Sequence, residues 1–353
     1  MKKILLMSAA AVLFCANAAH AEVKLNLTGH IKGYVFYTKQ DNPPGGDERS
    51  FDILRETEIH FGGETTLDNG LTVGVYNEAD IDVADVFKTE KSYAYFSGDW
   101  GRVNFGKEEG ANYLLQVAAP SADSNYDGVR QYVSGFNGFG TIDYDNDLTT
   151  YYTKLTYLTP VLSGFQAGIS YTPDTDDFGP VSATSQAIAD NLSDETGEYE
   201  SAWDVGAQYK GKFDDVSYTV GAGYTIVGYE ETGPGDPDDD SQEWNICVDT
   251  DWKNFGLGVV YTETNLGTDD DEARTWVVGA DYKLNKDWKL GASYLNYEED
   301  TSTDDEIDRY TAGGVYTYGP GMTLRGSVSY VDLETNTSDR DGVSLLIGTQ
   351  INF

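Results

Sequence analysis

The chain has 353 residues, with 23 Lys and Arg against 60 Asp and Glu and a formal net charge of −37. This balance excludes a typical nucleic-acid-binding protein, because such proteins neutralise phosphates with clustered basic side chains. The 26 Tyr, 14 Phe and 6 Trp exclude a fully disordered chain, since disordered chains are poor in aromatic residues. The 39 Gly against 9 Pro and 2 Cys exclude a collagen or a disulfide framework and favour many strands and turns.

Residues 1–21 have the pattern of an export signal. Lys2 and Lys3 form a positive start, an apolar stretch follows, and Ala19-His20-Ala21 matches a cleavage site. The apolar stretch is shorter than the ~18 residues that a membrane-spanning helix needs. We therefore expect cleavage after the last of these alanines and a mature, exported chain of residues 22–353.

From residue 23 onward, apolar and polar side chains alternate with a period of two. Leu25, Leu27 and Ile31 share one parity, while Asn26 and Lys32 share the other. Repeated segments of this kind are typical of an all-β transmembrane barrel, in which lipid-facing and lumen-facing residues alternate. Sixteen antiparallel strands are predicted, near residues 23–37, 51–66, 71–78, 91–97, 102–107, 150–158, 165–171, 201–209, 216–229, 242–250, 255–262, 273–282, 289–297, 307–318, 323–333 and 342–353. Arg55 is a mismatch, because it falls on the lipid-facing parity.

The connections between the predicted strands alternate between short turns and long loops, as in outer-membrane barrels. All six tryptophans fall near a strand end, as an aromatic girdle requires. Lysines gather at the short turns, whereas the long loops at 172–200, 230–243, 263–272 and 298–308 carry 27 acidic residues and no Lys or Arg. A soluble protein with a solvated acidic face does not predict this link between charge and loop length.

Three segments carry a resemblance to a known family. They are Glu58 to Glu78 with its Asp-Asn-Gly turn, Gly98 to Lys107, and the alternating tail from Val343 to Phe353. The chain resembles the general diffusion porins of Gram-negative outer membranes, in the alphaproteobacterial and neisserial-type branch. The resemblance implies a sixteen-stranded barrel, a homotrimer, a third loop folded inward, and a terminal Phe353 that the barrel-assembly machinery reads.

The stretch 108–149 is too long for an ordinary connection, and the resemblance makes it the constriction loop. Its charged residues are Glu108, Glu109, Asp123, Asp127, Arg130, Asp143, Asp145 and Asp147. Parity, with the resemblance, places Lys24, His30, Lys32, Glu58, His60, Arg102, Lys154 and Arg325 on the lumen wall. An acidic loop that faces a basic wall would orient solutes and favour cations. Any single acid of the loop could equally hydrogen-bond the loop's own backbone.

Two groups of residues suggest metal binding. Asp143, Asp145 and Asp147 have the spacing of a calcium loop, but Leu148 and Lys154 stand where an EF-hand needs Gly and Glu, so only a looser calcium site remains. The acidic run 236–240 could recruit divalent ions that bridge lipopolysaccharide phosphates. His30 and His60 are expected to be wall residues, because zinc needs three or four ligands.

The pattern as a whole predicts an outer-membrane, water-filled, cation-preferring pore for small hydrophilic solutes, with no cofactor. An enzyme is not expected, because no Ser/His/Asp spacing supports a nucleophile with an oriented base. One alternative is a soluble, secreted, acidic β-rich protein that binds calcium or belongs to a surface layer. Another is a solute-specific channel, which would need a row of aromatic side chains in the lumen that parity alone cannot place.

Overall fold

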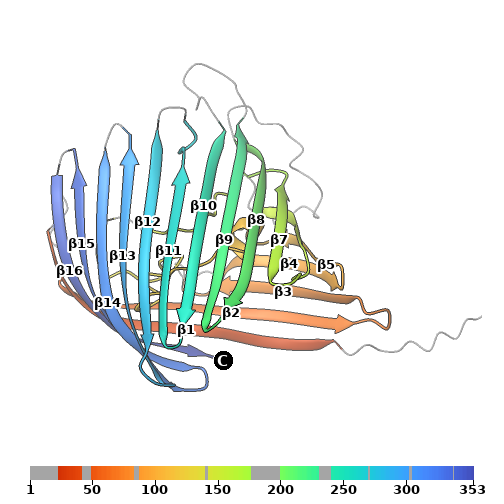
Figure 1. The fold of residues 1–353 in the computed structure, drawn as a ribbon, viewed down its shortest axis with the longest axis horizontal. Helices are drawn as coiled ribbons and strands as arrows, with labels where there is room; N and C mark the ends of the chain where they lie inside the picture. Colours follow the sequence, from red (N-terminus) through yellow and green to blue (C-terminus); the bar gives the residue numbers. More distant parts are fainter. Residues whose placement is uncertain are drawn as a thin grey trace, which may run out of the picture.

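The computed structural model describes residues 23–41, 49–82, 87–139, 142–175, 199–229, 240–268, 271–301, 304–336 and 338–353. Within these ranges sixteen antiparallel strands form a closed barrel, in which each strand pairs with its chain neighbours and β1 pairs with β16 (Figure 1). The predicted barrel and its strand count are confirmed. The export signal and most of the acidic run 236–240 lie outside the described residues.

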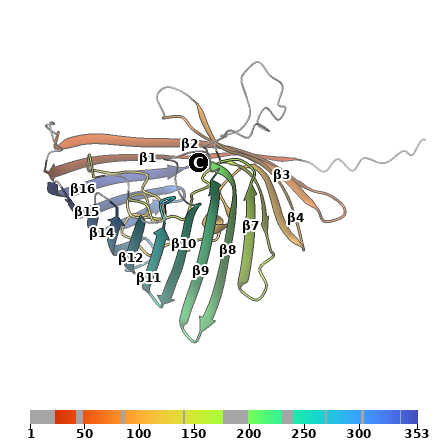
Figure 2. The same cartoon turned by 90° about the horizontal axis from the view of Figure 1, so that it is seen from above.

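The strands are β1 (Lys24–Gln40), β2 (Phe51–Thr66), β3 (Thr72–Asp80), β4 (Lys88–Gly98), β5 (Gly101–Lys107), β6 (Thr153–Leu158), β7 (Phe165–Thr172), β8 (Tyr199–Phe213), β9 (Val216–Tyr229), β10 (Ser241–Trp252), β11 (Phe255–Thr264), β12 (Glu272–Lys283), β13 (Trp288–Asp300), β14 (Asp305–Gly319), β15 (Met322–Thr335) and β16 (Ser338–Asn352). One short helix, α1 (Ala111–Leu114), lies between β5 and β6. Figure 2 shows the strands surrounding the chain that follows β5.

Most strands extend beyond the predicted ranges, because backbone pairing continues after the apolar alternation ends. β4, for example, begins at Lys88 rather than at residue 91, and still pairs with β3 there. β6 is the exception and begins at Thr153 rather than at residue 150. Thr150 has a positive φ of 30° and donates its backbone N–H to the Asp147 carbonyl, which keeps this segment in the preceding loop.

The two ends of the barrel differ as the sequence predicts. One end carries tight turns such as Asp68-Asn69-Gly70, where Gly70 adopts a φ of 83° that favours glycine. All six tryptophans are exposed at strand ends, in agreement with the predicted girdle.

Within the ranges that the structure describes, helices long and apolar enough to traverse a lipid bilayer are absent.

The outer face of the barrel is apolar, as the lipid-facing parity predicts. Leu25, Leu27 and Ile53 are all more than 60% exposed there. Arg55 also points outward, and its guanidinium lies 2.9 Å from a carboxylate oxygen of Asp82. The mismatch in the pattern is therefore an outward-facing ion pair, made with the segment that follows β3.

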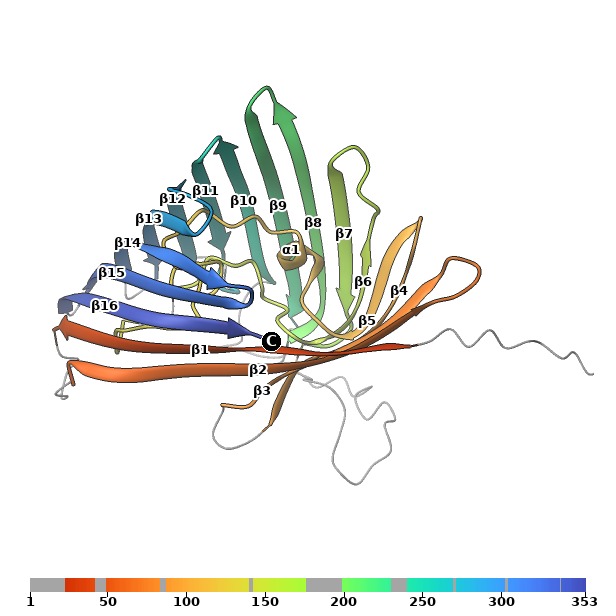
Figure 3. The same ribbon diagram turned by 90° about the horizontal axis from the view of Figure 1, so that it is seen from below.

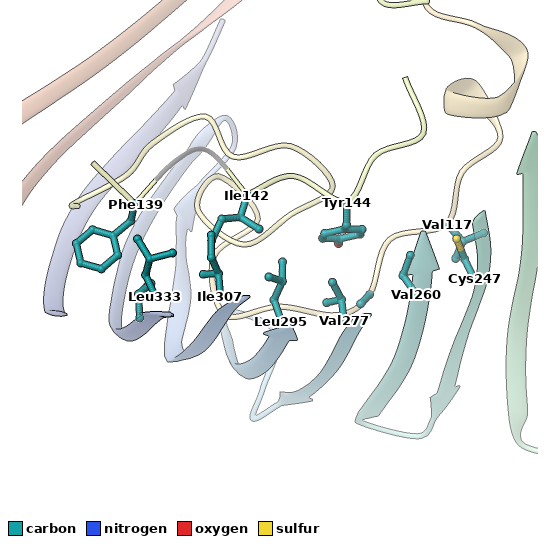
Figure 4. Packing of buried hydrophobic residues seen from close by; sticks show 12 residues of the cluster. Val117, Phe139, Ile142, Tyr144, Cys247, Val260, Val277, Leu295, Ile307 and Leu333 are labelled. Carbon is teal, nitrogen blue, oxygen red and sulfur yellow. The ribbon is translucent and has the colours of Figure 1, made fainter. Parts of the chain in front are cut away.

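An apolar cluster lies on the inner face of the barrel. Six consecutive strands, β10 to β15, contribute buried side chains to it, and the segment between β5 and β6 supplies the rest (Figure 4). The strand members are Cys247, Val260, Val277, Leu295, Ile307, Val331 and Leu333. Val117, Ala119, Phe139, Ile142 and Tyr144 pack on them. Because burying one such aliphatic side chain contributes roughly 1.5–3 kcal/mol, this stripe holds the segment firmly against the wall.

Candidate functional site

The segment between β5 and β6, residues 108–152, lies inside the barrel and is called the inner loop below. Figure 3 shows α1 and the chain beside it within the space that the strands enclose. Its position confirms the predicted inward fold, although the loop runs three residues past the predicted end at 149. Of its length, residues 108–139 and 142–152 are described.

Glycines on the wall let the backbone of the inner loop approach the strands closely. A Cβ atom on Gly206 would lie 2.5 Å from the Ala111 carbonyl oxygen, and one on Gly291 would lie 2.5 Å from that of Ser121. A Cβ atom on Gly279 would overlap the carbonyl oxygen of Pro120. Side chains at these positions would exclude the loop from its present path, so glycine is required for close packing.

Arg130 connects four side chains of the inner loop to one another. Its Nε donates to Asp145 at 2.7 Å, and its Nη1 donates to Glu109 at 2.9 Å and to the Tyr151 hydroxyl at 2.8 Å. Its Nη2 also donates to Asp147. The guanidinium therefore neutralises acids that the sequence places in the constriction. Of these acids, Glu109 also lies 3.5 Å from Lys91 Nζ on the wall.

Burial has the largest influence on the pKa values of the acids around Arg130. It raises the pKa of Asp145 to about 6, because desolvation outweighs the favourable charge of the guanidinium. Burial and the neighbouring Glu109 carboxylate raise the pKa of Asp147 well above its usual range. Burial also raises the pKa of Glu108. These carboxyl groups are structural partners within the loop, and they do not form a solvated acidic ring.

Lys154, predicted to line the lumen, is instead buried beneath the inner loop. Its Nζ donates to the backbone carbonyls of Glu108, Thr149 and Thr150, the last two at 3.1 and 2.7 Å. These carbonyls belong to the start and the end of the loop. Lys154 points inward as its parity requires, but it joins the two ends of the loop and is not open to solutes.

Asp123 and Asp127 are also buried and attach the middle of the inner loop to the wall. Asp123 accepts from Arg325 Nη1 at 2.6 Å and from the Tyr34 hydroxyl at 2.7 Å. Asp127 accepts from the Ser293 hydroxyl at 2.6 Å. The expected pairing of an acidic loop with a basic wall is therefore present at Arg325, where it fixes the loop.

The calcium-like triplet is not brought together around one point. Asp145 and Asp147 bind Arg130, while Asp143 accepts from the backbone N–H of Gln131. Among the described residues, the groups with metal-ligand geometry lie elsewhere, on the wall of the barrel. The structure thus corrects the expectation that this spacing gathers three carboxylate ligands.

The inner faces of β1 to β5 carry a second set of charged side chains, which contacts the inner loop at Lys32 and Lys91. Lys32 Nζ lies 2.7 Å from Glu56 and 3.6 Å from the centre of the Tyr132 ring of the loop. Lys91 Nζ lies 3.2 Å from Glu78. The predicted wall residues Lys32, His30, Glu58, His60 and Arg102 all belong to this set.

An aromatic row crosses the same wall. Ring centres are 5.8 Å apart from His30 to His60, 5.7 Å from His60 to Tyr76, and 5.5 Å from Tyr76 to Tyr93. Beside the row lies a cavity of about 290 Å³, whose lining includes Tyr76, Tyr93 and Arg102. Sequence reasoning missed this row because tyrosine suits either face of a strand, so parity could not orient it.

The remaining predicted positions lie at the end of β1 that carries the tight turns. Lys24 is exposed and sits opposite Glu64 in the β1–β2 register. Phe353 exchanges two backbone hydrogen bonds with Gly29, both 3.0 Å long, which continue the closure of β16 on β1. Its proposed reading by the assembly machinery remains a prediction.

A closed sixteen-stranded barrel with a loop folded into a charged lumen is the architecture of a membrane channel. The model of the Gram-negative porin family matches residues 8–336. The chain belongs to this family, and it is a multi-pass barrel protein of the outer membrane. This placement argues against the soluble, secreted alternative, and the family and the fold indicate a channel rather than an enzyme.

Two curated relatives are similar over part of their length. An outer membrane porin protein of Bordetella pertussis is 26% identical over 218 residues, which are 54% of this chain and 54% of that protein. An uncharacterized protein of Rickettsia prowazekii is 26% identical over 221 residues, which are 51% of this chain and 49% of that protein. The chain spans about half the length of the curated relatives it matches.

Several solved porins share the fold. An anion-selective porin from Comamonas acidovorans superposes with a TM-score of 0.65 at 16% identity, covering 94% of this chain and 100% of that chain. The trimer form of OmpT of Vibrio cholerae gives 0.61 at 13% identity, covering 94% and 99%. OmpF of Salmonella typhi in complex with daunomycin gives 0.61 at 18% identity, covering 93% and 97%. At these identities the likeness shows the fold alone.

Proposed function

We propose that this protein forms a water-filled channel through which small hydrophilic solutes and ions cross the outer membrane by passive diffusion. The observation that carries the proposal is the position of the inner loop, which packs on β7 to β16 and on β1, while a cavity of about 290 Å³ lies on the inner faces of β1 to β5. Closure of the barrel satisfies every backbone hydrogen bond of the spanning strands, so the protein can surround water within lipid.

We further propose that the channel prefers cations. Four carboxylates line the wall of β2 to β4, at Glu56, Glu58, Glu78 and Glu90, and the lysines that contact carboxylates there are Lys32, Lys88 and Lys91. At the end of the barrel with long loops, a cavity of about 230 Å³ between β12 and β14 is lined by seven acidic residues and one arginine. Carboxylates at an entrance and along a wall raise the local concentration of cations.

The partners that we propose are a homotrimer of this chain, outer-membrane lipid with lipopolysaccharide, and the barrel-assembly machinery. The trimer is supported by the trimer form of OmpT among the proteins of like fold. Calcium is proposed only for the acidic loops, as an ion that bridges them to lipopolysaccharide phosphates. No part of the proposed diffusion requires a cofactor.

Recordings from planar lipid bilayers test the channel and the trimer together. Insertion of the purified, detergent-extracted protein is expected to raise the current in one step. High voltage is then expected to close that step in three equal parts, because three separate barrels gate independently. Protein that gives no current steps would refute the channel, and closure of each insertion in a single part would refute the trimer.

The aromatic row supports a second candidate, a channel with a preferred solute. Tyr76 and Tyr93 expose ring faces beside Arg102 and the 290 Å³ cavity, which combines stacking surfaces with polar groups. Stacking on aromatic rings is one way in which proteins bind flat or ring-shaped ligands. Concentration-dependent block of the current by such a solute would favour this candidate over unselective diffusion.

A further inference from the structure

Two histidines and one glutamate meet on the lumen wall, on the neighbouring strands β1 and β2. In the register of this hairpin, His30 lies opposite Glu58, and His60 lies two residues further along on the same inner face. We propose that His30, His60 and Glu58 form a binding site for a divalent transition metal ion of the Zn²⁺ type. Alternation within β2 places Glu58 and His60 on one face, and the pairing of β1 with β2 brings His30 to them.

The distances between the three groups fit one metal ion. His60 Nε2 lies 2.9 Å from Glu58 Oε2, and His30 Nε2 lies 3.8 Å from Glu58 Oε1. The ligand atoms of all three residues lie within 4.8 Å of one another. Ligands about 2.0–2.2 Å from a tetrahedral Zn²⁺ are separated by about 3.3–3.6 Å, so small side-chain rotations bring these atoms to the metal. Two imidazoles with one carboxylate is a ligand set that Zn²⁺ uses, with a further position left for water.

The charges around the histidines single out Glu58. Glu56 pairs with Lys32 at 2.7 Å, and Glu78 pairs with Lys91 at 3.2 Å. The ion pairs of Glu58 with described residues are instead both made with histidines. Glu58 is thus a nearly buried carboxylate without a permanent cation, and a metal ion would supply the missing positive charge.

Two further acids, Glu56 and Glu78, lie beside the histidines. His30 Nε2 also lies 3.0 Å from Glu56, and His60 Nε2 lies 3.7 Å from Glu78. When the metal takes each Nε2 atom, the hydrogen bond with Glu56 is given up, and Glu56 keeps its lysine. The side chains of His30 and His60 are 13% and 19% exposed, so an ion in the lumen can reach them.

The location of the site predicts a consequence for permeation. Lys32 is the neighbour of this cluster, and its Nζ lies over the Tyr132 ring of the inner loop. The site therefore lies on the lumen wall beside a contact between the wall and the inner loop. A bound divalent ion would add two positive charges there and would reduce the preference of the channel for cations.

Isothermal titration calorimetry with Zn²⁺ on the full, detergent-solubilised protein tests the site without depending on the proposed channel. We expect one saturable site for each chain and an affinity that falls about tenfold or more in His30→Gln and in His60→Gln. Glu58→Gln should weaken binding in the same direction. The matched control is Glu64→Gln, which removes a carboxylate from the same face of β2, where it accepts from the Tyr95 hydroxyl at 2.6 Å, and should bind as the wild type does.

Absence of saturable binding, or unchanged affinity in both histidine variants, would overturn the proposal. A difference in gel mobility between the unboiled and the boiled sample of each variant shows that its barrel has folded, and Glu58→Gln serves if a histidine variant has not. In bilayers, micromolar Zn²⁺ should shift the reversal potential toward anions in the wild type and not in His60→Gln. That last readout alone rests on the proposed channel, so its failure with retained binding would count against the channel and not against the site.

Discussion

Replacing Arg130 with alanine is expected to release the inner loop from its fixed position and to abolish a single, stable conductance level. The substitution leaves Glu109, Asp145 and Asp147 buried without the guanidinium that contacts all three. Removing one partner of a buried ion pair costs about 3–5 kcal/mol, because the other charge stays desolvated. Single-channel recordings should show several levels with frequent transitions, and proteases should cut within residues 108–152.

Arg49→Ala is the control for this experiment. Arg49 also pairs with a carboxylate, that of Asp52 at 2.6 Å, but its side chain is 80% exposed. Exposed ion pairs contribute little, so this variant should keep the wild-type conductance. If Arg130→Ala also keeps one wild-type level and resists proteases, Arg130 does not hold the loop.

Adding one methyl group at Gly279 is expected to lower the conductance. The new Cβ atom would overlap the carbonyl oxygen of Pro120 in the inner loop. β12 is hydrogen-bonded to β11 and β13 on both sides and cannot retreat, so the loop must move toward the opposite wall. Overpacking of this kind costs about 1–3 kcal/mol, and the displaced loop narrows the passage. Gly279→Ala should therefore show a smaller current step in bilayers.

Gly62→Ala is the matched control, because it places a methyl group on the inner face of β2, away from the inner loop. Its Cβ atom would meet the Val75 carbonyl oxygen at 3.6 Å, which is an ordinary contact. Both variants add one methyl group to the inner face of the barrel, and only that of Gly279→Ala meets the loop. Equal current steps from Gly279→Ala and Gly62→Ala would mean that the glycine does not position the loop.

The strands and their orientation could be predicted from the sequence because the period-two alternation is a local property of each strand. Leu25, Leu27 and Ile31 are exposed on the outside, as their parity requires. The inner apolar stripe was missed, although the sequence carries a signal for it. Val259-Val260 and Val277-Val278 place apolar residues on both faces at once. Val260 of the first pair and Val277 of the second are buried under the inner loop. Such doublets indicate the strand positions that the inner loop covers.

The partners of the loop acids could not be predicted, because they depend on the path of a chain without alternation. Composition indicates that residues 108–149 are acidic, but only the path brings Arg130 to Glu109 and Asp145. The same limit applies to the wall. Parity places His60 and Glu58 on the inner face, but the β1–β2 register is needed to bring His30 to them. Residues that act across strands follow from pairing, which the local pattern does not contain.

The central claim is a cation-preferring channel, and the reversal potential in asymmetric KCl tests it most directly. The formal net charge of −37, the acidic cavity between β12 and β14 and the excess of carboxylates on the wall of β2 to β4 all attract cations. With concentrated KCl on one side of a bilayer, we predict a reversal potential that has the sign of K⁺ diffusion. A reversal potential with the sign of Cl⁻ diffusion, as in an anion-selective channel, would contradict the account.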